Sequence, residues 1–423
     1  MAKKGRLERV QMKEAGLKPE ISRRSASMPA SPIRGLVPYA ERALKRGKRV
    51  FFLNIGQPDV PTPGGFFEAV RNFHEPVLAY GTSHGNPGLV EALVRVYRDE
   101  LAVTLEPGNV LVTAGGSEAL WFTVMTLCDP GDELIVPEPF YANYAAVCAA
   151  AGVKIVPVTT RTEEGYHLPS GDPAGAVESR ISPRTRGILL SHPGNPTGTV
   201  FTREEVGLLA RVAVEHGLFI IADEVYRDFA YDGLPFTSFA SLEWAKENVV
   251  VIDSISKRYS ACGARIGFIV SRNREVMEQA MKFAQSRGCT PALEQAGAAA
   301  LYETPASFLQ GVRAEYEERR DALCLALEAI PGIAFRKPEG AFYLSARIPV
   351  EDAQAFAIWM MEEFDLDGET VLFAPLEGFY ATPGLGRDEI RLCYALEKEK
   401  LARAAEILGA GLAAYRKREG TPA

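Results

Sequence analysis

Four segments with chemically useful polar side chains stand directly after short apolar runs of the chain. They are Ala114-Gly115-Gly116-Ser117, His192-Pro193-Gly194-Asn195-Pro196-Thr197-Gly198, Asp223-Glu224-Val225-Tyr226 and Ser254-Ile255-Ser256-Lys257. Ligand sites of open α/β sheets lie beyond the carboxyl ends of the strands, so segments that follow neighbouring strands meet at one edge of the sheet. We therefore predict one site that gathers an anion cradle, an amide, a carboxylate, a phenol and an amine.

Each of these groups has a definite chemistry and a simpler alternative. Gly115-Gly116-Ser117 at the start of a helix can bind a phosphate, because free N–H groups and the helix dipole point at it. A glycine pair after a strand is also an ordinary tight turn. Asp223 ends an apolar strand, where a carboxylate needs a donor or cationic partner or else caps a helix. An amine kept away from water, as Lys257 would be, is a nucleophile for a Schiff base, whereas a lone lysine is usually at the surface.

The elements that position these groups are strands that alternate with helices. The predicted strands are residues 110–113, 133–136, 154–158, 187–191, 218–222 and 249–253. Strands that are apolar on both faces suit a buried parallel sheet, and their alternation with helices indicates an α/β fold with right-handed crossovers. Thr202 and Glu205 have the spacing of a capping box that opens a helix, and Gly217 is the predicted end of that helix.

After residue 300 the regular alternation of strands and helices ends, and this change in pattern predicts a second, smaller α+β domain. A charged amphipathic stretch at 308–330 is followed by strands at 341–346 and 389–393 and by helices at 350–363 and 398–418. The predicted division is a flexible tail at 1–30, an N-terminal arm with part of the small domain at 31–60, a large domain at 61–305 and a small domain at 306–423. For the basic tail, the alternative to disorder is an arm or short helix that packs on a partner.

Composition and charge narrow the class of protein. The 423 residues are 47% hydrophobic and 24% charged, which is typical of a globular protein. The net charge of −7 argues against nucleic acid as the main partner. No apolar run approaches the ~20 residues of a membrane helix, and the N-terminus lacks the apolar core of a secretory signal. The six cysteines form no C-x-x-C pair, which favours a reducing cytoplasm over a disulfide framework or zinc site.

Motifs along the chain resemble those of one family. The stretch from Ser254 to Gly267 places a serine three residues before Lys257 and an arginine eight residues after it. Three more motifs are Asn195-Pro196-Thr197-Gly198, Asp223-Glu224-Val225-Tyr226 and Arg391-Leu392-Cys393-Tyr394. No G-x-G-x-x-G turn follows the first strand, and no P-loop motif occurs, so dinucleotide-binding and P-loop interpretations lack support. From about residue 32 to its end, the sequence resembles the class I and II aminotransferases, aspartate aminotransferase among them.

These aminotransferases are fold-type I enzymes that use pyridoxal 5′-phosphate (PLP). The resemblance implies an α/β fold with a mostly parallel seven-stranded sheet in the large domain and a smaller α+β domain. It implies exchange of an amino group between an L-amino acid and a 2-oxo acid by a ping-pong mechanism. A related PLP-dependent lyase, such as a carbon–sulfur lyase, is the alternative, because the motifs are shared. A ligand-sensing regulator of this fold would need a winged-helix domain first, for which about 30 residues are too few.

The resemblance assigns roles to residues of this sequence. Lys257 would form the internal aldimine with PLP and then act as the base that moves the Cα proton. Asp223 would keep the pyridine nitrogen protonated, so that the ring acts as an electron sink. Tyr226 and Asn195 would hydrogen-bond the 3-oxygen of the cofactor. Arg391 would bind the α-carboxylate of the substrate as a bidentate pair, helped by Asn195.

Further residues complete the implied site. The phosphate of PLP would be bound by Gly115, Gly116, Ser117, Ser254 and Arg265. Tyr141 would stack on the ring, and the backbone at Gly56 would approach the substrate carboxylate. Tyr80 resembles the tyrosine that reaches the phosphate site of the neighbouring subunit, which implies a homodimer with shared active sites. The predicted partners are the amino acid and 2-oxo acid substrates; charge, hydropathy and cysteine spacing lead us to expect no nucleic acid, membrane or metal partner.

The sequence leaves the choice of substrate open. Arg287 is in the region where dicarboxylate-specific members of the family carry an extra arginine, although a surface arginine is the simpler interpretation. Four aromatic residues could instead favour an apolar or aromatic substrate, or be ordinary core residues: Tyr39, Phe140, Phe379 and Tyr380.

Overall fold

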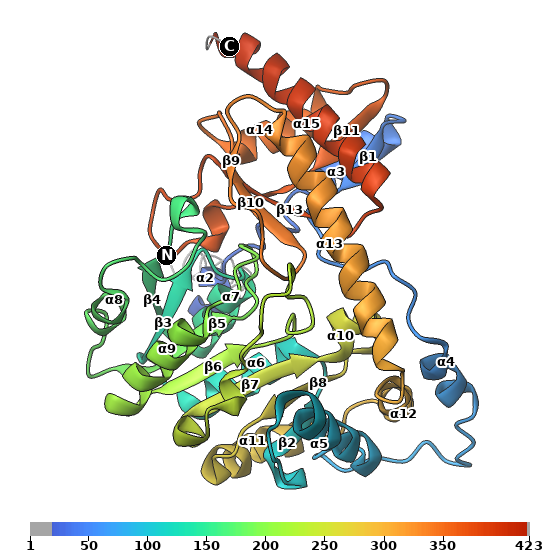
Figure 1. The fold of residues 1–423 in the computed structure, drawn as a ribbon, viewed down its shortest axis with the longest axis vertical. Coiled ribbons are helices and arrows are strands. Elements are labelled where there is room, and N and C mark those ends of the chain that lie inside the picture. The colour runs from blue at the N-terminus through green and yellow to red at the C-terminus, as the bar shows by residue number, and fades with distance from the viewer. Residues whose placement is uncertain (1–18, 421–423) are drawn as a thin grey trace, which may run out of the picture.

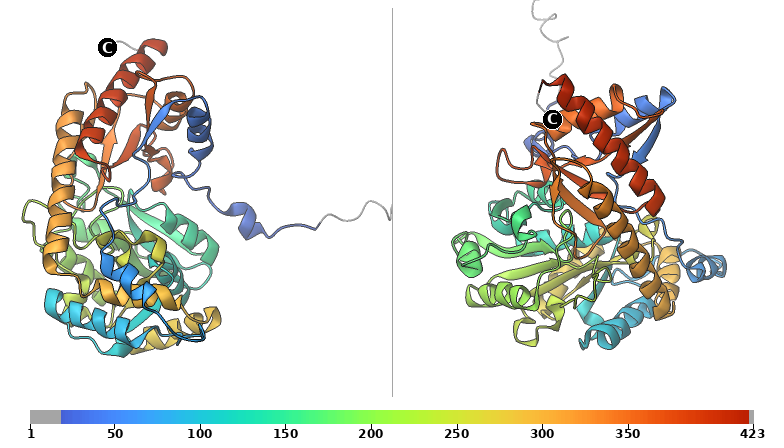
Figure 2. Two further views of the ribbon diagram at one scale, coloured as in Figure 1. Left: turned by 90° about the vertical axis from the view of Figure 1, so that its right-hand side faces the viewer. Right: turned by 45° about the horizontal axis from the view of Figure 1, so that its top comes forward.

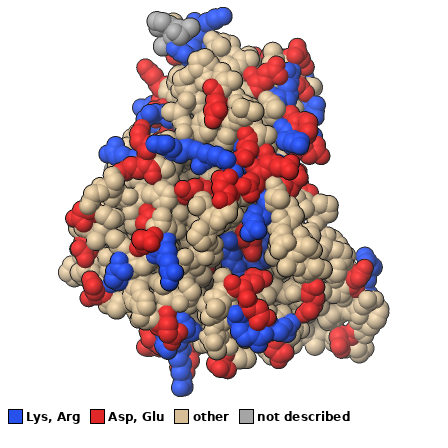
Figure 3. All heavy atoms as spheres, in the orientation of Figure 1, with Lys and Arg blue, Asp and Glu red and all other residues tan. Residues whose placement is uncertain are grey.

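A computed structural model describes residues 19–420 of the chain. They form a lower part built on one large sheet and an upper part built on smaller sheets, which the long helix α13 (Ala306–Glu328) connects along one side (Figure 1). Lys and Arg side chains are interspersed with Asp and Glu over the face drawn in Figure 3. In the described part of the chain, no helix is both long and apolar enough to cross a membrane.

The large sheet has seven strands within the described residues, in the order β2-β8-β7-β6-β5-β3-β4. Their bounds are β2 (Val110–Thr113), β3 (Glu133–Glu138), β4 (Lys154–Thr159), β5 (Thr185–Ser191), β6 (Phe219–Asp223), β7 (Val249–Ser254) and β8 (Gly267–Val270). Strands β3 to β7 pair in parallel, whereas β8 runs antiparallel to both β2 and β7. The expected mostly parallel α/β sheet is therefore confirmed.

Alternate side chains of these strands enter two apolar clusters on opposite faces of the sheet. Ile220 packs in the cluster with α5 (Pro87–Leu101), α9 (Arg203–Glu215) and α12 (Ala292–Leu301). Ile221 packs in the cluster with α6 (Gly116–Leu127), α7 (Asn143–Ala151) and α11 (Arg274–Arg287). Because both faces are covered, the strands read as continuous apolar runs in the sequence.

The upper part contains two small sheets and a core of its own. One sheet has the order β12-β13-β10-β9, and in the other β1 pairs in parallel with β11. The strands are β1 (Arg49–Phe52), β9 (Ala334–Phe335), β10 (Tyr343–Arg347), β11 (Glu369–Leu372), β12 (Ala374–Pro375) and β13 (Glu389–Cys393). Helices α3 (Val37–Lys45), α14 (Ala353–Glu362) and α15 (Lys398–Arg418) pack with them in one apolar cluster.

Shorter helices complete the described chain. The α-helices are α2 (Arg23–Ser27), α4 (Gly64–Arg71), α8 (Pro173–Glu178) and α10 (Ile255–Arg258). The 3-10 helices are η1 (Pro107–Asn109), η2 (Thr162–Glu164), η3 (Phe239–Ser241), η4 (Glu243–Ala245), η5 (Cys262–Ala264) and η6 (Glu377–Phe379). Figure 2, left, shows the N-terminal segment with α2 projecting from the side of the molecule.

The predicted elements agree closely with the structure. Strands β2 to β7 match the six predicted strands with ends that differ by at most two residues. Thr202 and Glu205 form the predicted capping box of α9, and Gly217 follows its end at φ +63°. Strands β1, β8, β9, β11 and β12 were not predicted. The predicted tail at 1–30 is described only from residue 19, and its residues 1–18 lie outside the described part. Residues 19–30 include the exposed helix α2.

Candidate active site

The ends of β5, β6 and β7 and the start of α6 surround a cavity of 810 Å³. Eleven of the predicted site residues line it, namely Gly56, Gly116, Ser117, Tyr141, Asn195, Asp223, Tyr226, Ser254, Lys257, Arg265 and Arg391. Gly115 stands just behind the lining, and Tyr80 lies away from it. The cavity is therefore at the carboxyl edge of the sheet, where the strand order predicts a ligand site.

Lys257 follows β7 on the short helix α10, which Ser254 caps through its hydroxyl group. The Nζ atom of Lys257 donates a hydrogen bond to the carbonyl oxygen of Gly56 at 2.8 Å. It also lies 3.8 Å from the Sγ atom of Cys262. The amine is thus inside the cavity and is bound to a neutral acceptor rather than to a carboxylate, which leaves it available for chemistry.

Asp223 ends β6 and is 8% exposed. Its Oδ2 atom accepts a hydrogen bond from the hydroxyl of Tyr144 at 2.9 Å, and its Oδ1 atom accepts one from the Val225 N–H at 3.4 Å. Burial raises the pKa of Asp223 to about 6, although the hydrogen bond from Tyr144 acts in the opposite direction. A buried carboxylate of this kind is suited to bind a cationic group that enters the cavity.

Tyr226 is buried and its hydroxyl oxygen lies 2.8 Å from that of Tyr343. Tyr343 is on β10, so this contact joins the loop after β6 to the upper part of the molecule. Burial raises the pKa of Tyr226 well above its usual range, and the neighbouring Tyr343 hydroxyl adds to the effect. Tyr226 therefore stays a neutral phenol that can donate a hydrogen bond.

Arg391 is 1% exposed and has neutral partners in the structure. Its Nη1 atom donates to Asn195 Oδ1 at 3.0 Å and its Nη2 atom to the carbonyl of Asn54 at 2.6 Å. The ring of Tyr343 lies 4.4 Å from its guanidinium carbon. Its buried Nε atom has no hydrogen-bond acceptor among the described residues. A buried guanidinium without an anionic partner is costly, so it is placed to receive one.

The anion cradle is built from a glycine turn and an arginine. Gly115 caps α6 at φ +83°, a conformation that favours glycine, and a Cβ atom there would collide with the guanidinium of Arg265. Arg265 donates to the carbonyl oxygens of Cys262 at 3.0 Å and Ala114 at 3.3 Å. The first N–H groups of α6, the hydroxyl of Ser117 and the guanidinium therefore meet at one end of the cavity.

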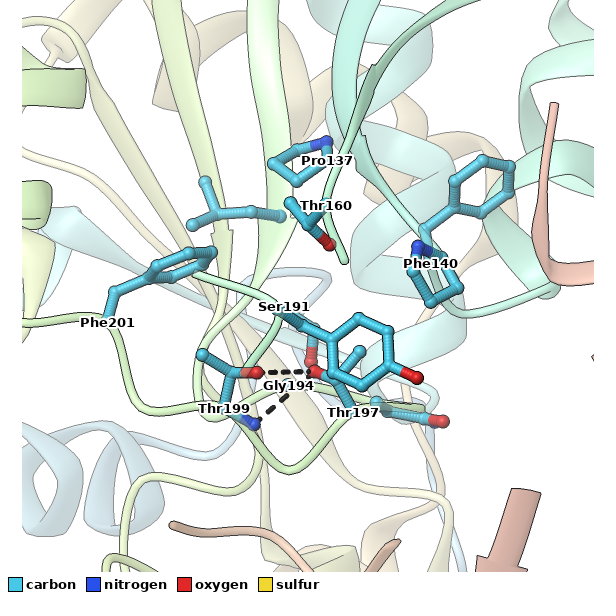
Figure 4. Close-up of a pocket in the computed structure, with 12 residues that line it drawn as sticks. Pro137, Phe140, Thr160, Ser191, Gly194, Thr197, Thr199 and Phe201 are labelled. Carbon is cyan, nitrogen blue, oxygen red and sulfur yellow. Dashed lines mark hydrogen bonds between the residues drawn. The ribbon is translucent and has the colours of Figure 1, made fainter. Parts of the chain in front are cut away.

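A second, small cavity of 20 Å³ lies behind Asn195 and has room for about one water molecule. Figure 4 shows the hydroxyl groups that border it, with Thr199 bound to Thr197 at 3.0 Å. The Ser191 hydroxyl donates to the Pro193 carbonyl at 2.9 Å, which fixes the turn that carries Asn195. The loop after β5 is therefore held by short polar contacts, and these hold Asn195 against Arg391.

Several residues singled out for substrate choice lie outside the large cavity. The expectation that Arg287 is a surface residue is wrong: its side chain is 17% exposed, 3.3 Å from Glu118 and bonded to the Val112 carbonyl. Its charge is paired within the chain, and it is not among the residues that line the cavity. The four aromatic residues considered for substrate choice also lie outside the large cavity: Tyr39, Phe140, Phe379 and Tyr380. Phe140 lines the small cavity instead.

Three contributors to the site were missed in the sequence. Tyr144 comes three residues after Tyr141 on the same turn of chain, a spacing that could have indicated a second tyrosine of the site. Tyr343 and the lining segment at 29–34 have no motif of their own. They reach the cavity only through the folding of distant parts of the chain.

Comparisons with known proteins agree with this geometry. The model of the family described as aminotransferase class I and II matches residues 48–408. A probable aspartate/prephenate aminotransferase of Aquifex aeolicus is 32% identical over 385 residues, 90% of this chain and 95% of that protein. An alanine aminotransferase of Pyrococcus furiosus superimposes with a TM-score of 0.85 at 30% identity, covering 93% of this chain and all of that one. An aspartate aminotransferase of Thermus thermophilus, a single mutant, has the same TM-score at 29% identity and covers 93% of this chain.

The match spans most of the chain and includes every motif that carried the resemblance. This chain therefore belongs to the class I and II aminotransferase family, whose members are PLP-dependent enzymes, and it is an aminotransferase.

Proposed function

We propose that this aminotransferase binds PLP in the cavity of 810 Å³ and exchanges an amino group between an L-amino acid and a 2-oxo acid there. The observation that carries the proposal is the buried Arg391, which has no carboxylate partner among the described residues and lines the same cavity as Lys257 and Asp223. An amino acid and a 2-oxo acid share an α-carboxylate. One guanidinium can therefore hold both substrates in the same orientation.

The residues present fit PLP. A phosphate group requires donors at a helix N-terminus, and the start of α6 offers N–H groups beside the guanidinium of Arg265. The cradle has no room for side chains at its two glycines, because a Cβ atom at Gly115 or at Gly267 would collide with its walls. A pyridinium nitrogen requires a buried carboxylate, which Asp223 supplies. Tyr141, whose ring packs edge-on against Tyr144, lines the wall expected to stack on the cofactor.

PLP supplies a ring that withdraws electrons from the Cα atom of the substrate. Asp223 holds a proton at the ring nitrogen, and Tyr144 keeps its carboxylate in place. Tyr226 and Asn195 would hydrogen-bond the 3-oxygen of bound PLP. Lys257 holds the cofactor and then takes the proton from Cα, for which its amine must leave the Gly56 carbonyl. These assignments make Lys257, Asp223 and Tyr226 the catalytic residues.

The two substrates then react in turn by a ping-pong mechanism, because Arg391 and Asn195 form one binding site for the α-carboxylate. Gly56 contributes to that site through its backbone, and the Tyr343 hydroxyl packs so closely against it that a Cβ atom at this position would collide with the hydroxyl. The phosphate of PLP would be held by Gly115, Gly116, Ser117, Ser254 and Arg265.

We also propose that the enzyme is a cytoplasmic homodimer in which Tyr80 completes the phosphate site of the partner. Tyr80 is 94% exposed, and Val77 and Leu78 beside it are 71% and 65% exposed. Apolar side chains grouped in this way favour an interface. All six cysteines are free, which supports a reducing compartment.

The proposed domain division places residues 31–60 with the small domain at 306–423, and β1 pairing with β11 supports it. The large domain at 61–305 then contains the seven-stranded sheet. The tail at 1–30 includes α2.

Incubation of the PLP-loaded enzyme with one amino acid and no 2-oxo acid tests the proposal. We expect one equivalent of 2-oxo acid per site and then a halt, and added 2-oxo acid of a second kind should restart the reaction. Continuous release of ammonia and pyruvate would instead show a lyase. The single-equivalent burst follows because each site can store one amino group.

A further inference from the structure

Two residues of the candidate site are each followed in the sequence by an arginine, Tyr226 by Arg227 and Lys257 by Arg258. Both arginines are buried, and neither lines the large cavity, whereas Tyr226 and Lys257 do. A guanidinium kept away from water is costly unless carboxylates pair with it. The proposed function gives neither arginine a role, so the reason for burying them lies elsewhere.

The carboxylates that pair with these arginines come from the same two segments of chain. The Nη1 atom of Arg227, in the segment after β6, lies 2.9 Å from Oδ2 of Asp253 on β7. The Nε atom of Arg258, on α10 after β7, lies 3.0 Å from Oδ2 of Asp228 in the β6 segment. Its Nη2 atom lies 3.2 Å from Oδ1 of Asp253. Each segment thus supplies one arginine and one aspartate, and we call these four residues the crossed ion-pair cluster.

Asp253 is the shared partner in this cluster. It is fully buried and also accepts a hydrogen bond at 2.7 Å from the N–H of Ser254, the residue whose hydroxyl caps α10. On the side of α5, the guanidinium carbon of Arg227 lies 4.8 Å from the centre of the Tyr97 ring, and its Nη2 atom lies 3.8 Å from Glu100 Oε2. The cluster is therefore enclosed by protein, where ion pairs are screened much less than at the surface.

We propose that the crossed ion-pair cluster positions Lys257 relative to Tyr226, with Asp253 as the carboxylate that joins them. Asp253 pairs with the arginine that follows each of the two residues, so it ties α10 to the segment after β6. Displacing either segment would leave a buried charge unpaired, which is costly. The spacing that the cluster preserves is the 6.0 Å between the Lys257 amine and the centre of the Tyr226 ring. This inference rests on the proposed function, because it assumes that both side chains act on one cofactor.

The visible absorption of the PLP-loaded enzyme gives a readout of this spacing. In its proposed role, Tyr226 hydrogen-bonds the 3-oxygen and stabilises its anion, which lowers the pH at which the proton between Lys257 and that oxygen leaves. Replacing Asp253 would deprive two buried cations of their shared partner, so the test changes each arginine in turn. We expect Arg227→Met and Arg258→Met each to raise the midpoint of the absorbance titration by at least about 0.5 pH unit.

Turnover of the same two variants should separate positioning from substrate binding. The value of kcat should fall at least about 10-fold, because a small displacement of reacting groups is costly in rate. The KM for the amino acid should stay within about 3-fold of the wild type, since Arg391 binds the α-carboxylate and is not part of the cluster. A rise in KM with kcat unchanged would contradict the proposal.

Arg258→Lys distinguishes position from charge. It keeps the positive charge, but a single ammonium group does not bridge Asp228 and Asp253 as the planar guanidinium does. Its absorbance midpoint should therefore also lie above that of the wild type. A midpoint equal to that of the wild type would show that the charge alone acts on Lys257, and would overturn the positioning role.

Arg320→Met is the matched control for the loss of a buried guanidinium. Arg320 is fully buried on α13 and lies 2.8 Å from Asp232 and 2.7 Å from Asp321, but it does not line the large cavity. Arg258→Met and Arg320→Met should both lower the urea midpoint, whereas only Arg258→Met should move the absorbance midpoint and kcat. Equal absorbance midpoints in the two variants would make the cluster a purely structural feature. If the wild type transfers an amino group from no amino acid, the proposed function fails instead, and the absorbance comparison still decides whether the cluster positions Lys257.

Discussion

Asp223 combines its proposed chemical role with a cost in stability. Burial raises its pKa to about 6, more than the Tyr144 and Val225 hydrogen bonds lower it. A carboxyl group whose pKa is higher in the folded than in the unfolded chain destabilises the fold as pH rises from about 4 to about 6, because the unfolded chain releases its proton first. Each pKa unit of difference corresponds to about 1.4 kcal/mol.

We expect Asp223→Asn to stabilise the protein without cofactor by about 1–3 kcal/mol at pH 7 and to give no such gain near pH 4. The same variant loaded with PLP should lose at least about tenfold in rate, or about 1.4 kcal/mol of barrier, because the ring nitrogen loses its acidic partner. Urea unfolding at both pH values and the rate of 2-oxo acid formation measure the two effects. A variant less stable than the wild type at pH 7 would contradict the cost assigned to burial.

Among the single residues of the candidate site, the sequence predicts those at strand ends and misses those that come from distant parts of the chain. Asp223 and Lys257 could be identified because each directly follows an apolar strand. Tyr144 lies 79 residues from the aspartate it binds, and Tyr343 lies 117 residues from Tyr226. No local pattern specifies such pairs, because tertiary packing alone brings them together.

The junction of β8 with the start of α6 leaves no room for a side chain. A Cβ atom at Gly267 would collide with the backbone of Gly115 and Gly116, which form the anion cradle. Gly263, four residues earlier in the helix η5, has open space around the same position. The two glycines, one in η5 and one at the start of β8, therefore form a matched pair for comparison.

We expect Gly267→Ala to destabilise the protein by about 1–3 kcal/mol, because the inserted methyl group must push the two backbones apart. The affinity for PLP and for inorganic phosphate should fall with it, since the cradle N–H groups move. Gly263→Ala should stay within about 0.5 kcal/mol of the wild type and keep its affinity for PLP. Thermal unfolding and PLP titration measure both variants, and equal behaviour of the two would refute the assigned role of the junction.

His167 joins the start of α9 to the segment that leads into β10. Its Nδ1 atom lies 2.8 Å from Glu205, the capping-box residue of α9, and its Nε2 atom lies 3.2 Å from Glu339. These two carboxylates raise the pKa of His167 to about 10, Glu205 more than Glu339. A histidine whose pKa is raised on folding stabilises the protein fully below about pH 6.5, and this contribution disappears as pH rises toward 10.

His167→Gln should therefore lower the free energy of unfolding by about 1.5–3 kcal/mol at pH 6. The difference from the wild type should shrink steadily between pH 6.5 and pH 10. His216→Gln is the control, because the ring of His216 is 40% exposed and its contact with Glu178 is on the surface. Urea midpoints at pH 6, 8 and 10 would show the trend, and a loss independent of pH would mean that the ring acts by packing alone.

Among the elements, the regular strands were predictable and the irregular pairings were not. Strands β3 to β7 are apolar on both faces and separated by helices, so composition and spacing identify them. Strand β8 has four residues, starts at a glycine and is antiparallel to its neighbours. It therefore lacks the strand-then-helix pattern that identifies the parallel strands. The pairing of β1 with β11 joins residues 49–52 to 369–372, and no local pattern records a partner so distant.

The described single chain leaves one prominent apolar feature uncovered. Tyr80 is 94% exposed, whereas most aromatic side chains of the chain are packed in its cores, and it stands next to the exposed Val77 and Leu78. This segment follows α4, which projects from the edge of the molecule in Figure 1. A second copy of the chain that covers this segment would remove the apolar exposure and bring Tyr80 to a phosphate site. A two-fold interface repeats each contact, so two equivalent sites would form.

Hybrid dimers test this arrangement. Lys257→Ala and Tyr80→Ala should each be poorly active alone. In a hybrid, one site would have both defects and the other neither, if Tyr80 acts across the interface. Random reassortment makes about half of the dimers hybrid, so about a quarter of all sites should be intact after the two variants are unfolded and refolded together.

The matched control mixes Lys257→Ala with Asp223→Ala, whose side chains line one cavity within one chain. Each site of that hybrid keeps one defect, so refolding should restore no activity. Recovery to about a quarter of wild-type activity in the first mixture and none in the second would place Tyr80 in the partner's site. If the first mixture also stays inactive while mass spectrometry confirms hybrid dimers, Tyr80 does not serve the opposite subunit. The two mixtures can differ in recovered activity only if Tyr80 acts across the interface. If Tyr80 acted within its own chain, the first mixture would recover as little activity as the control.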